Sequence, residues 1–230
     1  MIALAWWILN RPVGPGADST AATSKPSSTA ASTTASTTAT IPANSIAAQA
    51  HWTIDGDTID ISVNGVVERL RLLNINAPEK RSGAIPAECL SGEAAGVLIE
   101  LAPRNTPLRV VRHGKDRYGR TLGEAWLSNG TMLGAEVVRR GLAAPLTVGG
   151  LAAYRPVIDA ARDEAAAAHR GLHGTVPACT VPARVAELKP RDPAAAAVLA
   201  DLESRTPSAG VAALTDAHRA SLVATVMSRG

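Results

Sequence analysis

The stretch TIDISVNGVVERLRLLNI, residues 58–75, decides the fold of this chain of 230 residues. Residues 58–63 alternate between polar and apolar side chains, which is typical of a strand with one buried face. The pair Asn64-Gly65 is a strong signal for a tight hairpin turn. Residues 66–75 are therefore expected to return as the partner strand of a hairpin.

The second strand of this hairpin carries leucines and arginines in alternation. Successive side chains of a strand point to opposite faces. We therefore expect Leu70 and Leu72 on one face and Arg69 and Arg71 on the other. The same backbone can then bury its leucines and present Arg71 to a cleft.

The chain on the C-terminal side of the hairpin continues with short strands and helices, and the domain that they form is expected to be of the α+β class. Short strands with interspersed helices fit a small β-barrel. In chain order we expect a helix over 92–102 with Ser91 as its N-cap, strands over 107–112 and 121–127, a turn at 128–130, helices over 132–140 and 154–169 that end at Gly141 and Gly171, and two later helices over 193–203 and 210–227.

The composition limits how the core is built. Apolar residues make up 46% of the chain, but aromatic residues make up only 3% and phenylalanine is absent. Val, Ile, Leu and Ala must therefore fill the interior. The net charge of +3 permits a polyanionic partner without requiring one. Positive charge is concentrated in one basic stretch, which contains Arg104, Arg109, Arg112, Lys115, Arg117 and Arg120. This stretch is either a solvated part of the surface or a phosphate-binding segment, and we favour phosphate binding.

The flanking segments differ from the central domain in composition. Residues 1–13 form an apolar leader that is too short to span a membrane, which takes about 20 residues, and we expect it to be the remnant of an export or anchor segment. Residues 14–49 are rich in Ser, Thr, Ala and Pro and are expected to form a disordered stalk. The folded domain is expected over 50–179, and a helical extension of unknown role over 180–230.

Four short segments carry polar side chains of the kinds that phosphodiester hydrolysis beside a hard cation requires. They combine acidic and amide oxygens, two arginines and one glutamate in a fixed order. These segments are Asp55-Gly56-Asp57-Thr58, RLLNINAPE at residues 71–79, Asp116-Arg117-Tyr118-Gly119-Arg120, and Arg140-Gly141-Leu142-Ala143.

The order and spacing of these segments resemble the thermonuclease family, the staphylococcal-nuclease-like domains. The resemblance covers about residues 50–179 and is closest to the exported bacterial type. It implies a five-stranded OB-type barrel with three α-helices. It also implies a calcium-dependent nuclease with nucleic acid as its substrate.

The expected calcium site combines Asp57, Asn76 and the backbone carbonyl of Ala77. Oxygen ligands of this kind suit a hard cation, and the three positions match the calcium ligands of the family. The position of Asn76 is usually aspartate in the family. An amide keeps the oxygen but loses a charge, so we expect calcium binding to be weaker by about one to a few kcal/mol.

The expected catalytic residues are Arg71, Glu79 and Arg120. Fixed cationic donors stabilise the extra negative charge that a phosphorus centre gains in the transition state, and arginine offers a planar fork that stays protonated. Glu79 is placed to orient or deprotonate the attacking water. The alternatives are structural ion pairs for the arginines and a plain surface position for Glu79.

Arg117 and Tyr118 match positions that contact a terminal phosphate in the family. Tyr118 can also stack on a base or ribose, and loop packing is its alternative role. The loop at 145–150, PLTVGG, lacks the tyrosines that often flank a nucleotide in the family. We therefore expect weaker substrate binding and cleavage with little sequence preference.

The two cysteines, Cys89 and Cys179, leave three possibilities. An even count in an exported chain suggests one disulfide. The resemblance implies the same pair, because many exported members carry one cysteine just before the first helix and another after the last. Two free thiols in a cytosolic protein, or a zinc site with His169 and His173, are the alternatives.

The sequence thus predicts a secreted or cell-surface bacterial nuclease that requires calcium and cleaves DNA and also RNA. We expect a monomer that can attach to a membrane or cell surface through its N-terminus. The alternatives are a catalytically weak or silent barrel that binds nucleic acid or protein, and a wall-associated structural module. Retention of Arg71, Glu79 and Arg120 favours the enzyme, whereas Asn76 favours the silent barrel.

Overall fold

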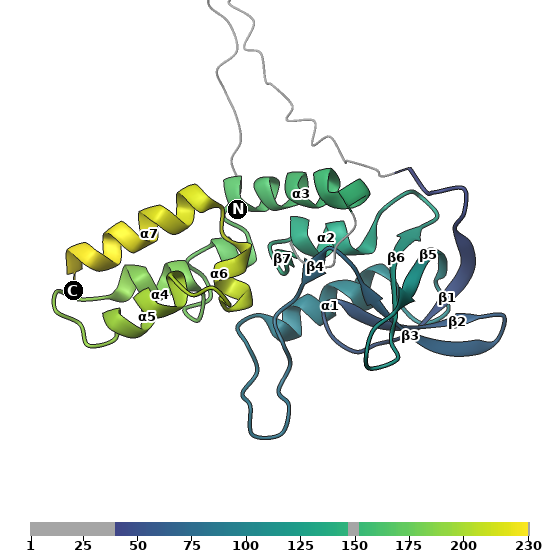
Figure 1. Cartoon of the computed structure of the whole chain (residues 1–230), viewed down its shortest axis with the longest axis horizontal. Coiled ribbons are helices and arrows are strands. Elements are labelled where there is room, and N and C mark those ends of the chain that lie inside the picture. The colour runs from purple at the N-terminus through teal and green to yellow at the C-terminus, as the bar shows by residue number, and fades with distance from the viewer. Residues whose placement is uncertain (1–39, 147–151, 230) are drawn as a thin grey trace, which may run out of the picture. The chain divides into compact units, whose positions relative to one another are not determined.

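The computed structural model describes residues 40–146 and 152–229 (Figure 1). The predictions for the leader, for most of the stalk and for the loop at 147–150 lie outside the described residues. Among the helices in the described residues, none is both long and apolar enough to cross a membrane.

Five strands form a closed mixed barrel in the order β1-β2-β3-β6-β5. All neighbouring strands are antiparallel except β3 and β6, and β1 pairs with β5 to close the barrel. The predicted five-stranded OB-type barrel of the α+β class is confirmed. The strands are β1 Ile46–Thr53, β2 Thr58–Val63, β3 Val66–Leu72, β5 Pro107–Lys115 and β6 Thr121–Leu127.

The central hairpin of the barrel forms as the sequence predicts. Asn64 and Gly65 have φ values of 50° and 82°, the double positive φ of a type I′ turn. The register pairs Thr58 with Arg71. Leu70 and Leu72 are fully buried, and the arginines of β3 lie on the opposite face.

Strand β1 crosses the predicted boundary at residue 50. It begins at Ile46, and Ile41 packs against the core before it. Arg109 of β5 donates a hydrogen bond to the hydroxyl of the buried Ser45 (3.1 Å). The ordered domain therefore extends into the segment that was expected to be linker.

Three helices accompany the barrel, namely α1 Ser91–Leu101, α2 Leu133–Arg139 and α3 Arg155–Ala167 (Figure 1). The short strands β4, Ile75–Asn76, and β7, Ala144–Pro145, pair with each other. The prediction that Ser91 caps α1 is wrong. Ser91 is the buried first residue of the helix, and Leu90 occupies the N-cap with φ 65°.

One aliphatic core joins the barrel to these helices, as the composition predicts. It contains Trp126, which is fully buried, as its largest side chain. Burial of apolar surface is the main force that holds these elements together. Its other fully buried large side chains include Ile59, Ile61, Leu70, Leu72, Ile75, Leu98, Leu133 and Ile158.

The C-terminal region contains four helices and a separate hydrophobic cluster. The cluster is made of aliphatic side chains such as Val185, Val198, Leu202 and Val226. Helix α6 packs against β7, and Ala213 belongs to the main core. The helices are α4 Val181–Glu187, α5 Ala195–Leu202, α6 Ala209–Ala213 and α7 Asp216–Arg229, and two single-turn helices precede them at η1 Ala152–Tyr154 and η2 Gly171–His173.

Cys89 and Cys179 form a disulfide with a Cα–Cα distance of 5.6 Å. The bridge connects the segment before α1 to the segment before α4 and closes a loop with a sequence separation of 90. Both sulfurs are bonded to each other, so neither the free thiols nor the zinc site stands. The described part of the chain also contains no group of three metal-binding His, Cys, Asp or Glu residues.

Candidate active site

An open cavity of about 640 Å³ lies on the outer face of β2 and β3, beside the loop that joins β5 to β6. Its walls are mostly polar and carry charges of both signs. Three of the predicted functional residues, Glu79, Tyr118 and Arg120, line it. The other lining residues are Asp60, Val67, Glu68, Arg69 and Gly119.

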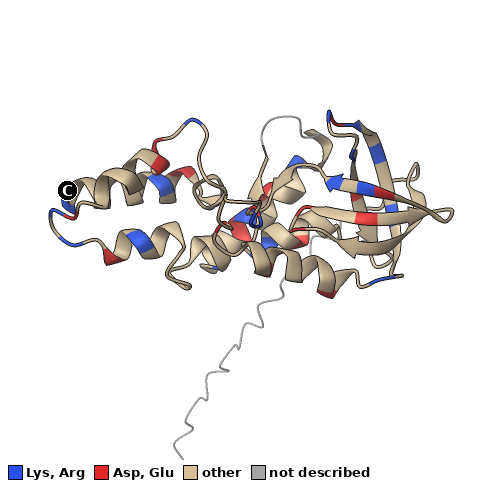
Figure 2. Cartoon of the chain, turned by 90° about the horizontal axis from the view of Figure 1, so that it is seen from below, with Lys and Arg blue, Asp and Glu red and all other residues tan. Residues whose placement is uncertain are grey.

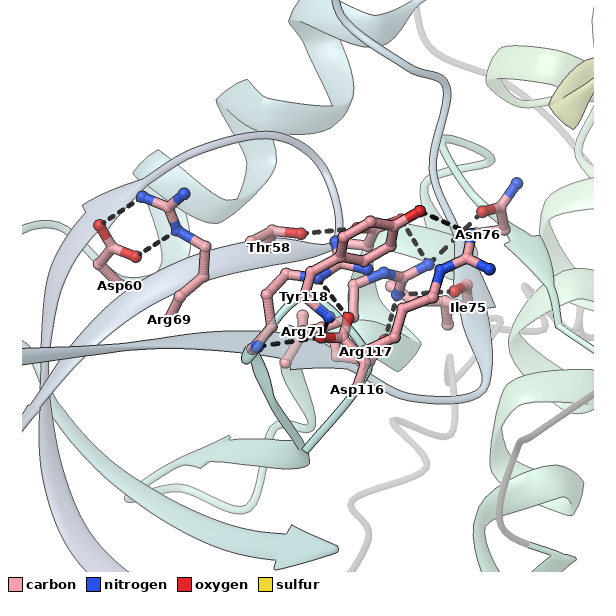
Figure 3. A network of polar contacts seen from close by, with 12 residues as sticks. Thr58, Asp60, Arg69, Arg71, Ile75, Asn76, Asp116, Arg117 and Tyr118 are labelled. Atoms are coloured by element: carbon pink, nitrogen blue, oxygen red, sulfur yellow. Dashed lines mark hydrogen bonds and ion pairs between the residues drawn. The ribbon is translucent and has the colours of Figure 1, made fainter. Parts of the chain in front are cut away.

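Arg71 and Asp57 form the most buried ion pair of the site. The guanidinium Nη2 of Arg71 lies 3.0 Å from Asp57 Oδ2, and only 12% and 6% of the two side chains are exposed. Arg71 also donates hydrogen bonds from Nη1 to the carbonyl oxygens of Ile75 (3.0 Å) and Leu72 (Figure 3). These acceptors fix the guanidinium in one orientation.

The turn between β1 and β2 positions the carboxylate of Asp57. Its Oδ1 accepts a hydrogen bond from the Thr58 hydroxyl (3.0 Å), and its Oδ2 accepts one from the Ala77 amide (2.9 Å). The backbone at Gly56 passes close to α1, because a Cβ there would lie 2.5 Å from Cβ of Ala94. Only glycine allows this approach without displacement of the neighbours.

The predicted cation ligands Asp57 and Asn76 both lie beside the Arg71 guanidinium. A single nitrogen, Arg71 Nη2, lies 3.0 Å from Asp57 Oδ2 and 3.4 Å from Asn76 Oδ1. Burial raises the pKa of Asp57 to about 6, although Arg71 opposes this and Asp55 adds to it. A carboxylate next to an amide oxygen offers the ligand types that a hard divalent cation takes.

Glu79 lines the cavity and is held through its backbone. Its amide donates to the carboxylate of Glu88 (2.9 Å), and its carbonyl accepts from the Glu88 amide (2.8 Å). Partial burial raises the pKa of Glu79, and Asp55 and Glu88 add to the increase, whereas Arg71 and Arg120 oppose it. Glu79 therefore lies within electrostatic reach of both predicted catalytic arginines.

The loop at 116–120 is organised by Asp116. Its carboxylate accepts hydrogen bonds from the amides of Tyr118 and Arg120, both 2.9 Å, and from Nε of Arg120 at 2.6 Å. The guanidinium of Arg120 lies 5.7 Å from the centre of the Tyr118 ring. Arg120 is thus oriented by Asp116, for which the sequence predicted no role of its own.

Arg117 and Tyr118 contact each other at the edge of the cavity. Arg117 Nη2 donates to the Tyr118 hydroxyl oxygen (2.6 Å), and its guanidinium lies 4.7 Å from the ring centre (Figure 3). Tyr118 lines the cavity with 69% of its surface exposed.

The basic stretch is partly neutralised. Arg112 and Arg120 pair with Glu68 and Asp116, and Arg109 bonds to Ser45. In Figure 2 basic and acidic residues both occur along the barrel strands. Within the described residues, Arg104, Lys115 and Arg117 have no ion pair, so no carboxylate offsets their charges.

The fourth segment, Arg140 to Ala143, serves packing and does not line the cavity. Arg140 pairs with Glu100 (2.6 Å) and Glu136 (3.1 Å). Leu142 and Ala143 belong to the main core.

Two charged positions were missed by sequence reasoning. Asp116 could have been found from its spacing, because an Asp that precedes a turn commonly accepts from amides two residues on. Glu88 lies nine residues from Glu79, and no local pattern marks that contact.

The closed five-stranded barrel thus brings two arginines, a glutamate and a buried aspartate together around one part of its surface. The family described as "Staphylococcal nuclease homologue" matches residues 69–174. Thermonuclease of Staphylococcus intermedius is 35% identical over 114 residues, which cover 49% of this chain and 67% of the relative. The chain belongs to the staphylococcal nuclease family.

Two further relatives are shorter matches. An uncharacterized endonuclease of Escherichia coli O157:H7 is 33% identical over 92 residues, 39% of this chain and 54% of the relative. Micrococcal nuclease of Shigella flexneri is 40% identical over 70 residues, 30% of this chain and 36% of the relative. The chain therefore spans about half or less of the length of these two relatives.

Proposed function

We propose that the chain is a calcium-dependent nuclease that hydrolyses phosphodiester bonds of DNA and RNA with little sequence preference. The observation that carries the proposal is one cavity lined by both Glu79 and Arg120, with Arg71, the ion-pair partner of Asp57, within electrostatic reach of Glu79. The names of the relatives, thermonuclease and endonuclease, agree with this reaction class.

The two arginines are proposed to hold the phosphate. Arg71 is oriented by two backbone carbonyls and Asp57, and Arg120 is oriented by Asp116. Donors fixed before the reaction need no reorganisation as charge develops on the equatorial oxygens of phosphorus. Their contribution is greatest if the contacts strengthen in the transition state.

Glu79 is proposed to orient the attacking water or to accept its proton. A general base works best when its pKa lies near the operating pH, and partial burial moves the pKa of Glu79 upward from the usual range of a glutamate. The backbone hydrogen bonds with Glu88 hold this residue at the cavity wall.

Asp57, Asn76 and the Ala77 carbonyl are proposed to hold calcium. The bound ion would supply positive charge beside the phosphate and lower the pKa of a coordinated water. Arg117 and Tyr118 are proposed to bind the substrate, by contact with a terminal phosphate and by stacking against a base.

The test is the release of acid-soluble nucleotides from single-stranded DNA by the full chain. We expect activity with calcium, loss with chelator, and a decrease of orders of magnitude in Glu79→Gln and Arg71→Met. Met227→Ala, an exposed change on α7, is the matched control. Nuclease activity that is unchanged by both substitutions would refute the catalytic roles of Glu79 and Arg71.

The second candidate function is a catalytically silent barrel that binds nucleic acid or protein. The observation in its favour is Asn76, which removes a charge from the cation site. Binding of oligonucleotide without any calcium-stimulated cleavage would select it over the nuclease.

A location outside the cytoplasm is proposed on the disulfide, because such bonds persist mainly in oxidising compartments. The secreted or cell-surface position, the attachment through the N-terminus and the monomeric state stay predictions. Non-reducing mass analysis of the chain from culture medium and from cells would test the first of them.

A further inference from the structure

Trp52 is an exposed tryptophan on the outer face of the barrel, where 66% of its surface is accessible. The described part of the chain has four Trp and Tyr residues. Trp126 is fully buried, and Tyr154 packs against it with ring centres 5.5 Å apart. Only Trp52 and Tyr118 of these four are exposed, and Tyr118 lines the candidate active site.

A β-bulge turns Trp52 outward. The register between β1 and β2 shifts by one residue between Ala50 and Trp52, so His51 is the extra residue. Ala50 faces the core, and strict alternation would send Trp52 inward as well. Because of the bulge, Thr53 takes the buried place instead. Bulges commonly re-aim a side chain in this way.

A shallow cavity of about 210 Å³ lies next to Trp52, between β1 and the end of α1. Ile99 and Pro103 form its apolar walls, and Arg104 lies at its edge without an ion pair to any described residue. Sites that enclose a whole small ligand measure about 300–1,000 Å³. The smaller volume suits one flat apolar group beside an anion.

This surface is continuous with the candidate active site. Trp52 lies opposite Asp60 in the register of β1 and β2, and Asp60 lies opposite Arg69 in that of β2 and β3. Directly opposed residues share a face of the sheet. Asp60 and Arg69 line the larger cavity, and Figure 3 shows the ion pair between them. Strands lie about 4.8 Å apart, so Trp52 is roughly 10 Å from Arg69 across the sheet.

We propose that Trp52 and Arg104 form an accessory site for single-stranded nucleic acid, in which Trp52 stacks on a base outside the cleavage site. Arg104 contacts the adjacent backbone phosphate. This inference rests on the proposed function, because the active-site cavity fixes the path of the strand. Nucleic acid suits the surface because every base offers an apolar face for stacking and every linkage a negative charge.

A protein partner fits this surface less well. Specific protein interfaces bury about 800 Å² on each side, far more than one tryptophan and a shallow cavity can provide. Isolated exposed apolar residues are common on proteins. Trp52 differs from these because a bulge, a cavity and an unpaired arginine coincide with it.

The test is binding of oligothymidylate of about 12 nucleotides, within the length that one OB fold covers. It is measured by fluorescence anisotropy on the full chain in chelator, so that the probe is not cleaved. We expect Trp52→Ala to weaken binding about 5- to 100-fold, the loss of one stacked base. Trp52→Phe should largely restore binding, and Arg104→Gln should reduce the salt slope by about one phosphate.

Two controls separate stacking from misfolding and from failure of the nuclease proposal. Met227→Ala removes an equally exposed apolar side chain from α7 and should bind like the wild type. A thymidine dinucleotide with its one linkage at the catalytic residues leaves no further nucleotide to cross the roughly 10 Å between Arg69 and Trp52, so Trp52→Ala should cleave it in calcium at the wild-type rate.

The outcomes separate the two proposals. If the wild type binds and cleaves the oligomer and Trp52→Ala behaves identically, the accessory site is refuted and the nuclease proposal stands. Equal loss of dinucleotide and oligomer cleavage in Trp52→Ala would show a structural role and also refute the site. If the wild type neither binds nor cleaves, the proposed function fails and this inference fails with it.

Discussion

Replacement of Asn76 by aspartate should tighten calcium binding. Asn76 Oδ1 lies 3.4 Å from Arg71 Nη2, and that nitrogen lies 3.0 Å from Asp57 Oδ2. In the variant, a cation held between these two side chains would have a full negative charge at ligand distance in place of the neutral amide oxygen. Two unit charges at about 4 Å interact by about 4 kcal/mol at an effective dielectric of 20. The partial desolvation of the new carboxylate and its attraction to Arg71 offset part of that energy.

We therefore expect a net gain of about 1–3 kcal/mol, which is roughly a 5- to 150-fold tighter dissociation constant. Isothermal titration of the full chain with calcium measures it directly. Asn64→Asp is the matched control, because it makes the same charge change in the exposed β2–β3 turn, where aspartate followed by glycine is also well tolerated. Equal calcium affinities of wild type and Asn76→Asp would refute the assignment of Asn76 as a ligand.

Three further predictions concern stability. Gly56→Ala should lower the free energy of unfolding in urea by about 1–3 kcal/mol, because the new Cβ would lie 2.5 Å from Cβ of Ala94 and 2.7 Å from Cβ of Ala77. A urea unfolding midpoint equal to that of the wild type would contradict this close approach. Replacement of both cysteines by serine should cost about 4 kcal/mol in the same assay, since the bridge closes a loop with a sequence separation of 90, and a cost below about 1 kcal/mol would speak against a structural bridge. Glu124→Gln should stabilise the protein at pH 8 and lose that advantage toward pH 4. Burial raises the pKa of Glu124 well above its usual range, so wild-type stability falls as the pH rises from the unfolded-state pKa toward the folded-state pKa. Thermal melts across this pH range measure the difference, and a constant difference would contradict the shift.

The central hairpin could be predicted from the sequence alone, because alternation and Asn64-Gly65 point to the same pairing, whereas the closed five-stranded barrel was implied by the family resemblance. The sequence pattern does not predict strand β1, for two physical reasons. Its inward positions carry small residues, Ala48, Ala50 and Thr53, which give a weak apolar signal. The bulge at His51 also breaks the period of two on which strand recognition depends.

The C-terminal helices show how a local signal can be misread. Pro182 lies in the first turn of α4, where proline is tolerated, so a proline that would ordinarily indicate a break belongs to a helix here. Thr180 caps that helix by accepting from the Ala183 amide (3.3 Å). The predicted helix over 210–227 is divided at Leu214 and Thr215 into α6 and α7.

The candidate site could be predicted as a set of residues but not as a set of contacts. Arg71, Glu79 and Arg120 were found from their order in the chain. The pairing of Arg71 with Asp57 depends on the β2–β3 register, and the contact of Glu79 with Glu88 depends on a loop that the disulfide at Cys89 anchors. These distances follow from tertiary structure, which no short segment encodes.

The distribution of aromatic residues changes one expectation about substrate binding. The absence of tyrosine from the loop at 145–150 predicts weak base stacking, but that argument considers only one side of the cavity. Trp52 and Tyr118 are both exposed; Arg69 is two strands from Trp52 in the sheet register and lines the same cavity as Tyr118. If both rings stack, the strand is held on the barrel face rather than by the later loop, and affinity should rise with oligomer length until the strand reaches Trp52.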